Sequence, residues 1–161
     1  MEVLENITYD EIKIGDQCQY SKTLTEADLL LFAAVSGDVN PVHLDEEFAS
    51  RSIFKERIAH GMWSGSLVSA TLATVMPGPG TIYLNQSLEF HRPVKLGDTL
   101  QVTLRAKKKI YDKKIITFSC DVKNQHDKSV LSGEAQVIAP TDKISLPRPK
   151  IPEITIESVQ L

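Results

Sequence analysis

The pattern of apolar and polar residues predicts helices in the first half of the chain and strands in the second. From Thr81 onward, apolar and polar positions alternate with period two in four stretches separated by turn residues, at 81–94, 98–109, 114–124 and 129–139. We expect these to form an antiparallel meander. A fifth strand is expected before the first helix, at 16–24. Helices followed by a run of strands indicate an α+β fold and not alternating α/β.

Three helices are expected before the strands. The first follows Thr25, which opens an approximate capping box, and Gly37 suits its left-handed end. A shorter helix begins at Asp45. The third starts after Gly61 and ends before the Pro-Gly repeat at 77–80. It is almost free of charged residues, so we expect it to be buried on all sides and wrapped by the sheet.

The length and composition fit one globular domain. The chain has 161 residues, 42% of them hydrophobic, which is enough to bury a core. The segment from Pro140 to the end contains four prolines and little pattern, so we expect a domain at 1–140 and an extended arm at 141–161. The start of the chain is acidic and lacks the apolar stretch of a signal peptide, and no apolar run reaches the roughly 18 residues of a spanning helix. A cytoplasmic location is therefore expected.

Charge and cysteine content exclude several classes of partner. The 18 basic and 21 acidic residues give a net charge of −3, which provides no global field for nucleic acid. The only dense basic run, 105–114, is interpreted as a solvated hairpin turn, with a phosphate-binding patch as the alternative. Cys18 and Cys120 form no C-x-x-C motif and lie in strand-like segments. We expect buried thiols there and no disulfide or thiolate metal site.

The segment SGDVNPVHLDEEF carries the first candidate chemistry. It places Asp38 and His43 five residues apart around an Asn-Pro turn. A carboxylate beside an imidazole suits proton transfer near neutral pH. Pro41 is expected to prevent a regular helix, so that the turn can bring both side chains to one side. The alternative is structural, with Asp38 bonding turn amides and His43 making a half-buried polar contact.

The same region contains residues suited to a metal site and to an oxyanion site. Asp38, His43, Asp45 and His60 are of metal-binding types, but their spacing matches no known ligand pattern, so no metal is predicted. Gly61 begins the uncharged helix, where its amide is free and the helix dipole is positive. Lacking a Cβ, it lets a carbonyl oxygen approach that amide. An ordinary glycine at a helix start remains the alternative.

Four segments together resemble the MaoC-like hydratases, the (R)-specific enoyl-CoA hydratase family with a hot-dog fold. They are SGDVNPVHLDEEFA, IAHGMWSGS, GTIYLNQSLEFHRPVKLGD and SGEAQV, in order between about Tyr9 and Ala139. The D-x-N-P-x-H block is the most specific part. The resemblance implies a long central helix wrapped by a five-stranded antiparallel sheet, and a homodimer or higher homo-oligomer, commonly formed by joining sheets edge to edge.

The resemblance also implies roles for individual residues. The family's catalytic aspartate and histidine fall on Asp38 and His43, with Asn40 supporting the turn between them. Gly61 matches the residue whose amide binds the thioester oxygen.

Substrate contacts are expected from Asn40 and from three residues on the helix that begins at Gly61. Ser66 falls on a family serine and is given a supporting polar role, and Met62 and Trp63 are assigned to substrate binding. Trp63 stands where the family often has leucine, so we expect it to shorten the acyl pocket.

The resemblance implies a hydro-lyase that adds water reversibly to trans-2-enoyl-CoA to give (R)-3-hydroxyacyl-CoA. We favour Asp38 as the base. The expected partners are the acyl-CoA substrate and further copies of the chain, with no cofactor, metal, nucleic acid or membrane. The alternatives are a 3-hydroxyacyl-acyl-carrier-protein dehydratase, a hot-dog thioesterase and a non-catalytic acyl-CoA-binding module.

Overall fold

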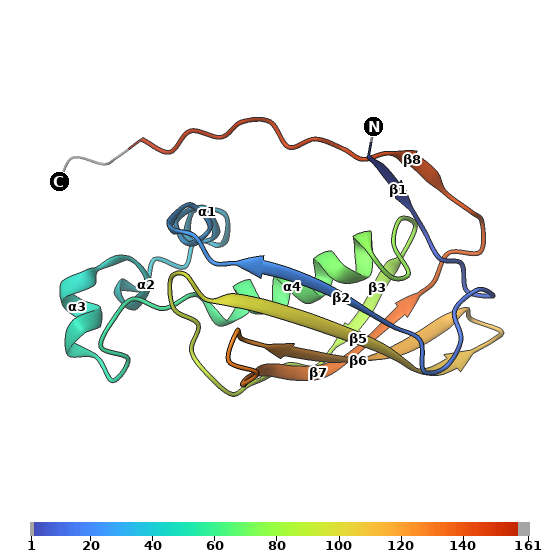
Figure 1. Ribbon diagram of the computed structural model, residues 1–161, viewed down its shortest axis with the longest axis horizontal. Helices are drawn as coiled ribbons and strands as arrows, with labels where there is room; N and C mark the ends of the chain where they lie inside the picture. Colours follow the sequence, from blue (N-terminus) through green and yellow to red (C-terminus); the bar gives the residue numbers. More distant parts are fainter. Residues whose placement is uncertain (1, 158–161) are drawn as a thin grey trace.

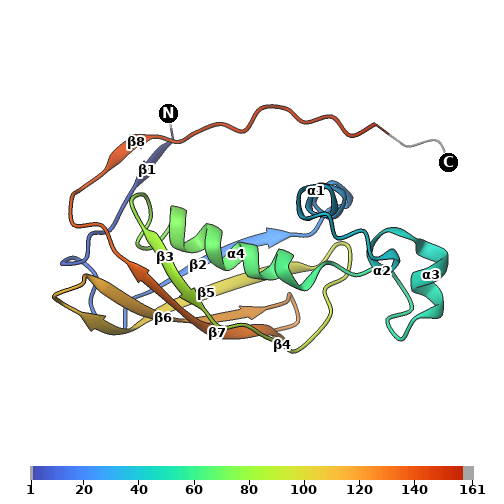
Figure 2. The same ribbon diagram turned by 180° about the vertical axis from the view of Figure 1, so that it is seen from behind.

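The computed structural model describes residues 2–157 and has an antiparallel sheet curved around one long helix, α4 (Figures 1 and 2). The main path of the sheet has the order β2-β5-β6-β7-β3, and a short strand, β4, also pairs with β7. The strands are β2 (Gln17–Thr23), β3 (Ile82–Gln86), β4 (Glu89–Phe90), β5 (Thr99–Ile110), β6 (Ile115–Lys123) and β7 (Ser129–Ile138). The predicted α+β architecture is confirmed, with five strands on the main path and β4 as an addition.

The predicted strand at 81–94 is divided into β3 and β4, which both pair antiparallel with β7 on either side of a close approach between Ser87 and Gly133. The Ser87 amide donates to the Glu134 carbonyl at 2.9 Å. A Cβ on the neighbouring Gly133 would lie 1.9 Å from the Ser87 carbonyl oxygen, closer than any side chain can approach. Glycine at position 133 therefore permits this close approach of the two backbones.

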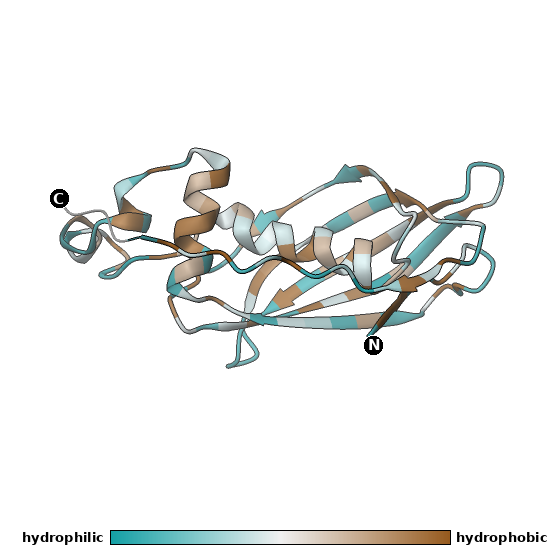
Figure 3. Ribbon diagram, turned by 90° about the horizontal axis from the view of Figure 1, so that it is seen from above, coloured by the Kyte–Doolittle hydropathy of each residue, from teal (hydrophilic) through white to brown (hydrophobic). Residues whose placement is uncertain are grey.

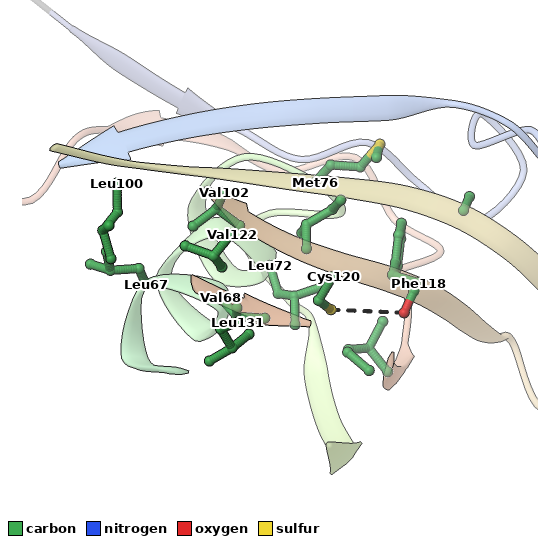
Figure 4. Packing of buried hydrophobic residues seen from close by; sticks show 14 of the residues in the cluster. Leu67, Val68, Leu72, Met76, Leu100, Val102, Phe118, Cys120, Val122 and Leu131 are labelled. Carbon is green, nitrogen blue, oxygen red and sulfur yellow. Dashed lines mark hydrogen bonds between the residues drawn. The ribbon is translucent and has the colours of Figure 1, made fainter. Parts of the chain in front are cut away.

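Helix α4 (Gly61–Thr74) supplies one wall of the core. Leu67, Val68 and Leu72 point into the apolar side chains of the sheet, which Figure 4 shows from close by. The sheet residues around them include Leu100, Val102, Phe118, Val122 and Leu131, all fully buried. The prediction of a helix buried on all sides is wrong for one side of α4, the open stripe formed by Met62, Ser66 and Ser69. Met62 is 56% exposed, and Ser66 and Ser69 are half-buried, because the sheet wraps only the other side of the helix.

Three shorter helices precede α4: α1 (Glu26–Ser36), α2 (Pro41–Leu44) and α3 (Glu46–Arg51). The predicted capping box at Thr25 and the left-handed end at Gly37 (φ 76°) are both confirmed. No regular helix runs from Asp38 to His43, as predicted, but Pro41 does not prevent helix formation after it. It opens the single-turn helix α2 at the first position, where its missing N–H costs no hydrogen bond, and Asn40 caps that helix.

The two ends of the chain form a second, two-stranded sheet. β1 (Val3–Glu5) pairs antiparallel with β8 (Ser145–Pro147). The buried Asn6 fixes this connection, since its side-chain amide donates to the Asp142 carbonyl at 2.8 Å and its oxygen accepts from the Ile144 amide at 2.9 Å. Beyond Arg148 the described chain runs without regular structure across α4 and α1 (Figures 1 and 3).

The basic run at 105–114 forms the β5–β6 hairpin, as predicted. Lys109 Nζ donates to the carbonyls of Tyr9 and Ile12 at 2.6 and 2.5 Å, and Lys114 lies 3.6 Å from the centre of the Tyr111 ring. The hairpin lies at the end of the sheet away from α2 and α3 (Figure 1). Two of its lysines therefore serve contacts within the chain, and the alternative of a phosphate-binding patch gains no support from them.

Both cysteines are free thiols, Cys120 fully buried and Cys18 partly buried. Burial raises the pKa of each thiol to about 11, so both stay protonated and unreactive near neutral pH. Within residues 2–157 no helix is long and apolar enough to cross a membrane. The cytoplasmic location stays a prediction.

Candidate active site

The loop between α1 and α2 brings Asp38 and His43 together, as the sequence predicted. Asp38 Oδ2 lies 3.9 Å from His43 Nε2. The Asp38 side chain is 52% exposed, whereas that of His43 is 9% exposed. The pair therefore presents an accessible carboxylate beside a largely buried imidazole, the two types of group that proton transfer requires.

Hydrogen bonds to the backbone fix the orientation of both side chains. His43 Nδ1 bonds the Ile58 carbonyl at 2.8 Å. Because a carbonyl only accepts, Nδ1 carries the hydrogen, and the Nε2 of the neutral ring is left as an acceptor facing Asp38. Asp38 Oδ1 accepts from the Asn40 amide at 3.1 Å, which leaves Oδ2 toward the histidine. The structural alternative for Asp38 is thus also true, since one oxygen bonds the turn and the other remains available.

His60 joins this pair, which sequence reasoning considered only as a metal ligand. Its Nε2 bonds the Asp38 carbonyl at 2.8 Å, and its ring stacks on that of His43 with 3.8 Å between centroids and 29° between planes. Asp45 is not part of the group, because its carboxylate accepts from the Phe48 amide and caps α3.

The donor atoms of Asp38, His43 and His60 lie within 4.8 Å of one another, close enough to be considered as metal ligands. Each imidazole already bonds a backbone carbonyl through one nitrogen. The remaining lone pairs lie in two nearly parallel ring planes, whereas tetrahedral coordination requires ligands that converge on one point. The geometry suits proton transfer better than metal binding, and the absence of a metal stays a prediction.

Gly61 follows His60 directly and is the first residue of α4. Among the described residues its amide donates to no protein acceptor, as expected at a helix N-terminus. A Cβ at this position would lie 3.1 Å from Cε1 of Phe90, so a side chain would crowd the space in front of the helix. The arrangement provides an N–H donor and a positive dipole end beside the stacked histidines.

Three hollows lie against α4, the first beside His60 and Gly61 and the other two along the following turns of the helix. The first, of about 310 Å³, is lined by His60, Gly61, Ser64, Phe90 and neighbouring residues. The second, of about 500 Å³, lies between the open stripe of α4 and β3 and includes Met62 and Ser66. The third, of about 510 Å³, lies beneath the C-terminal segment and includes Trp63 and again Ser66.

The predicted site residues are therefore only partly brought together. Asp38, His43 and Gly61 cluster around His60, while Asn40 acts as the cap of α2. Trp63 is buried on another side of α4 and lines the third hollow. The Ser66 hydroxyl donates to the Trp63 carbonyl at 2.6 Å, so its hydrogen is already used within the helix.

Comparisons with known proteins agree with this geometry. Residues 11–128 match the family described as MaoC like domain. A protein named (R)-specific enoyl-CoA hydratase from Rhodospirillum rubrum is 45% identical over 134 residues, covering 82% of this chain and 91% of that protein.

Solved structures confirm the hot-dog arrangement. R-hydratase PhaJ1 from Pseudomonas aeruginosa, unliganded, superposes with a TM-score of 0.93 at 51% identity, covering 97% of this chain and 100% of that one. The (R)-hydratase from A. caviae has a TM-score of 0.78 at 38% identity, covering 80% and 98%. The match to the family spans most of the chain and includes the Asp38–His43 turn and Gly61. This chain therefore belongs to the MaoC-like domain family.

Proposed function

We propose that this protein catalyses the reversible addition of water to trans-2-enoyl-CoA, giving (R)-3-hydroxyacyl-CoA. The observation that carries the proposal is the Asp38 carboxylate 3.9 Å from the acceptor nitrogen of His43, beside a free helix N-terminal amide. The relatives named (R)-specific enoyl-CoA hydratase support the same reaction and the same enantiomer.

The spacing of the pair suits one water molecule. Two acceptors 3.9 Å apart can each accept a hydrogen bond of about 2.8 Å from a single water, at an angle of about 90° at its oxygen. Both hydrogens of that water then point to Asp38 and His43, and a lone pair of its oxygen points outward. Asp38 takes one proton as the hydroxyl bonds to C3, and that proton is returned to C2. The addition balances with no cofactor, and the coenzyme A thioester is the substrate.

Negative charge develops on the thioester oxygen during the addition. The Gly61 N–H and the positive end of α4 provide the stabilisation that this charge requires. Exposed Asp38 and the hollow in front of Gly61 leave space for the thioester to approach.

We also propose that the protein acts as a homodimer. β3 is an edge strand of the sheet, and its large apolar side chains Ile82, Tyr83 and Leu84 are exposed, as is Phe90 on β4. An unpaired apolar edge invites pairing with a second copy. Sedimentation should give about twice the chain mass of 17.9 kDa, and a monomer at micromolar concentration would contradict the proposal.

The test is loss of the enoyl thioester absorbance band with crotonyl-CoA and longer enoyl-CoAs. The product is coupled to dehydrogenases specific for each 3-hydroxyacyl-CoA enantiomer, and the (R) enzyme alone should respond. Free thiol is measured in parallel, because a thioesterase would release it, and acyl-carrier-protein thioesters are compared with acyl-CoA. An unchanged band at every chain length, or an (S) or racemic product, would refute the proposal.

A further inference from the structure

His60 is a buried residue that contacts both members of the catalytic pair. It is 3% exposed, its Nε2 bonds the main-chain carbonyl of Asp38, and its ring stacks on His43. His60 lies 22 residues after Asp38 and 17 residues after His43, so both contacts join segments that are distant in sequence.

The hydrogen bond that His60 makes determines which of its ring nitrogens carries the hydrogen. The Asp38 carbonyl can only accept a hydrogen bond, so His60 Nε2 carries the hydrogen. Nδ1 of the same neutral ring then has a free lone pair and can act only as an acceptor. Among residues 2–157, this Nδ1 is the single buried side-chain nitrogen or oxygen atom without a hydrogen-bond partner.

Burying an acceptor without a hydrogen-bond partner lowers the stability of the folded protein. We therefore expect His60 to have a role for which an apolar residue could not substitute. Phe32 packs against the ring at 5.1 Å, and a phenylalanine at position 60 would satisfy that contact without a polar atom. A phenyl ring could not donate to Asp38, however. Among the described residues no backbone amide bonds the Asp38 carbonyl, which lies just after α1 has ended. The donor on His60 thus holds the backbone that carries the catalytic carboxylate.

We propose that His60 is a positioning residue for the hydration reaction, acting through Asp38 and His43 and not on the substrate. This inference rests on the proposed function. Its hydrogen bond sets the place of Asp38 and its ring sets the tilt of His43, so together they maintain the 3.9 Å spacing that one water can bridge. Misplacement of a reacting group by 1 Å can cost about 10²-fold in rate.

The test compares His60→Ala, His60→Gln and His60→Phe. The alanine variant should lose about 10²-fold in kcat with a smaller change in KM, since His60 contributes part of the wall of the first hollow but the Gly61 amide remains. Glutamine keeps a donor and phenylalanine keeps a stacked ring, so each should recover part of the loss. In an Asp38→Asn background, His60→Ala should cause little further loss, since the group that it positions no longer transfers a proton.

A matched control is Thr71→Val, which removes a fully buried polar group from a distant part of α4. Its hydroxyl bonds only the Leu67 carbonyl within α4, about 15 Å along the helix from Gly61. This variant should keep wild-type kcat. Thermal unfolding of every variant shows whether a loss of activity arises from a smaller folded fraction. An equal loss of kcat in Thr71→Val and His60→Ala would overturn the inference.

A second readout does not depend on activity. The chain has four histidines, so their ring resonances can be assigned in labelled protein by NMR. Removing the stacked ring in His60→Ala should shift the His43 ring resonances, whereas His60→Phe should restore most of the shift and Thr71→Val should leave them unchanged. If the wild-type protein hydrates no enoyl-CoA, the proposed function fails, and the shifts then test only the stacking of His60 on His43. Unmoved His43 resonances in His60→Ala, or wild-type kcat in that variant, would overturn the inference.

Discussion

Replacing Gly61 tests the thioester-oxygen site at the start of α4. An added Cβ would lie 3.1 and 3.3 Å from Cε1 and Cδ1 of Phe90, slightly tighter than ordinary van der Waals contact. Phe90 is 51% exposed, so its ring can turn aside toward solvent. The backbone at Gly61 has no positive φ. Gly61→Ala and Gly61→Val should therefore fold, while a side chain enters the hollow that the thioester oxygen must reach.

The expected loss follows from the interaction that is blocked. One oxyanion donor typically contributes about 10²- to 10³-fold in kcat, or about 2.7–4 kcal/mol. Valine carries two more carbon atoms than alanine into the hollow of about 310 Å³. We expect Gly61→Val to lose at least this factor and Gly61→Ala to lose less. Initial rates of crotonyl-CoA hydration, followed at the enoyl thioester band, measure both.

Gly65→Ala is the matched control. A Cβ at Gly65 would also meet a flexible side chain at 3.1 Å, Cδ1 of Leu88, one turn further along the same helix. The Gly65 amide, however, lies within the helix and is not a free donor. The control should therefore stay close to wild-type activity. A folded, fully active Gly61→Val enzyme would show that the thioester oxygen is bound elsewhere, and equal losses in the two alanine variants would point to packing instead.

Three further predictions concern the pair, the third hollow and the C-terminal segment. Asp38→Asn and His43→Gln should each lose roughly 10²- to 10⁴-fold in kcat, and the double variant should be little worse than the poorer single one. A multiplicative loss would mean that they act independently. Trp63→Leu should enlarge the third hollow and shift kcat/KM from four-carbon toward eight-carbon substrates, and an unchanged ratio would remove Trp63 from the acyl site. Truncation after Arg148 removes Ile151 and Ile154 from the third hollow but should leave Tm and kcat with crotonyl-CoA unchanged. Truncation after Pro140 should keep kcat but lower stability by about 1–3 kcal/mol, since buried Asn6 loses its partners; a dead, folded protein would give the segment a catalytic role.

The sequence by itself determined those features that depend on neighbours along the chain. The capping box at Thr25 and the left-handed end at Gly37 are formed within a single helix, so local residues suffice to specify them. The strands at 16–24 and after residue 97 follow from period-two alternation, because alternate side chains face one core. The sequence also brought Asp38 and His43 onto one short turn, although their final spacing depends on contacts from Ile58 and His60.

Tertiary structure decided the contacts between segments that are distant in sequence. His60 reaches Asp38 and His43 only because α4 begins beside α2, and its surrounding sequence carries no pattern that predicts a stacked ring. The break between β3 and β4 depends on Gly133, some 45 residues further along. The pairing of β1 with β8 and the open stripe of α4 depend on where the sheet ends. Local propensity gives no information about any of these, because each is stabilised by packing that exists only once the whole chain has folded.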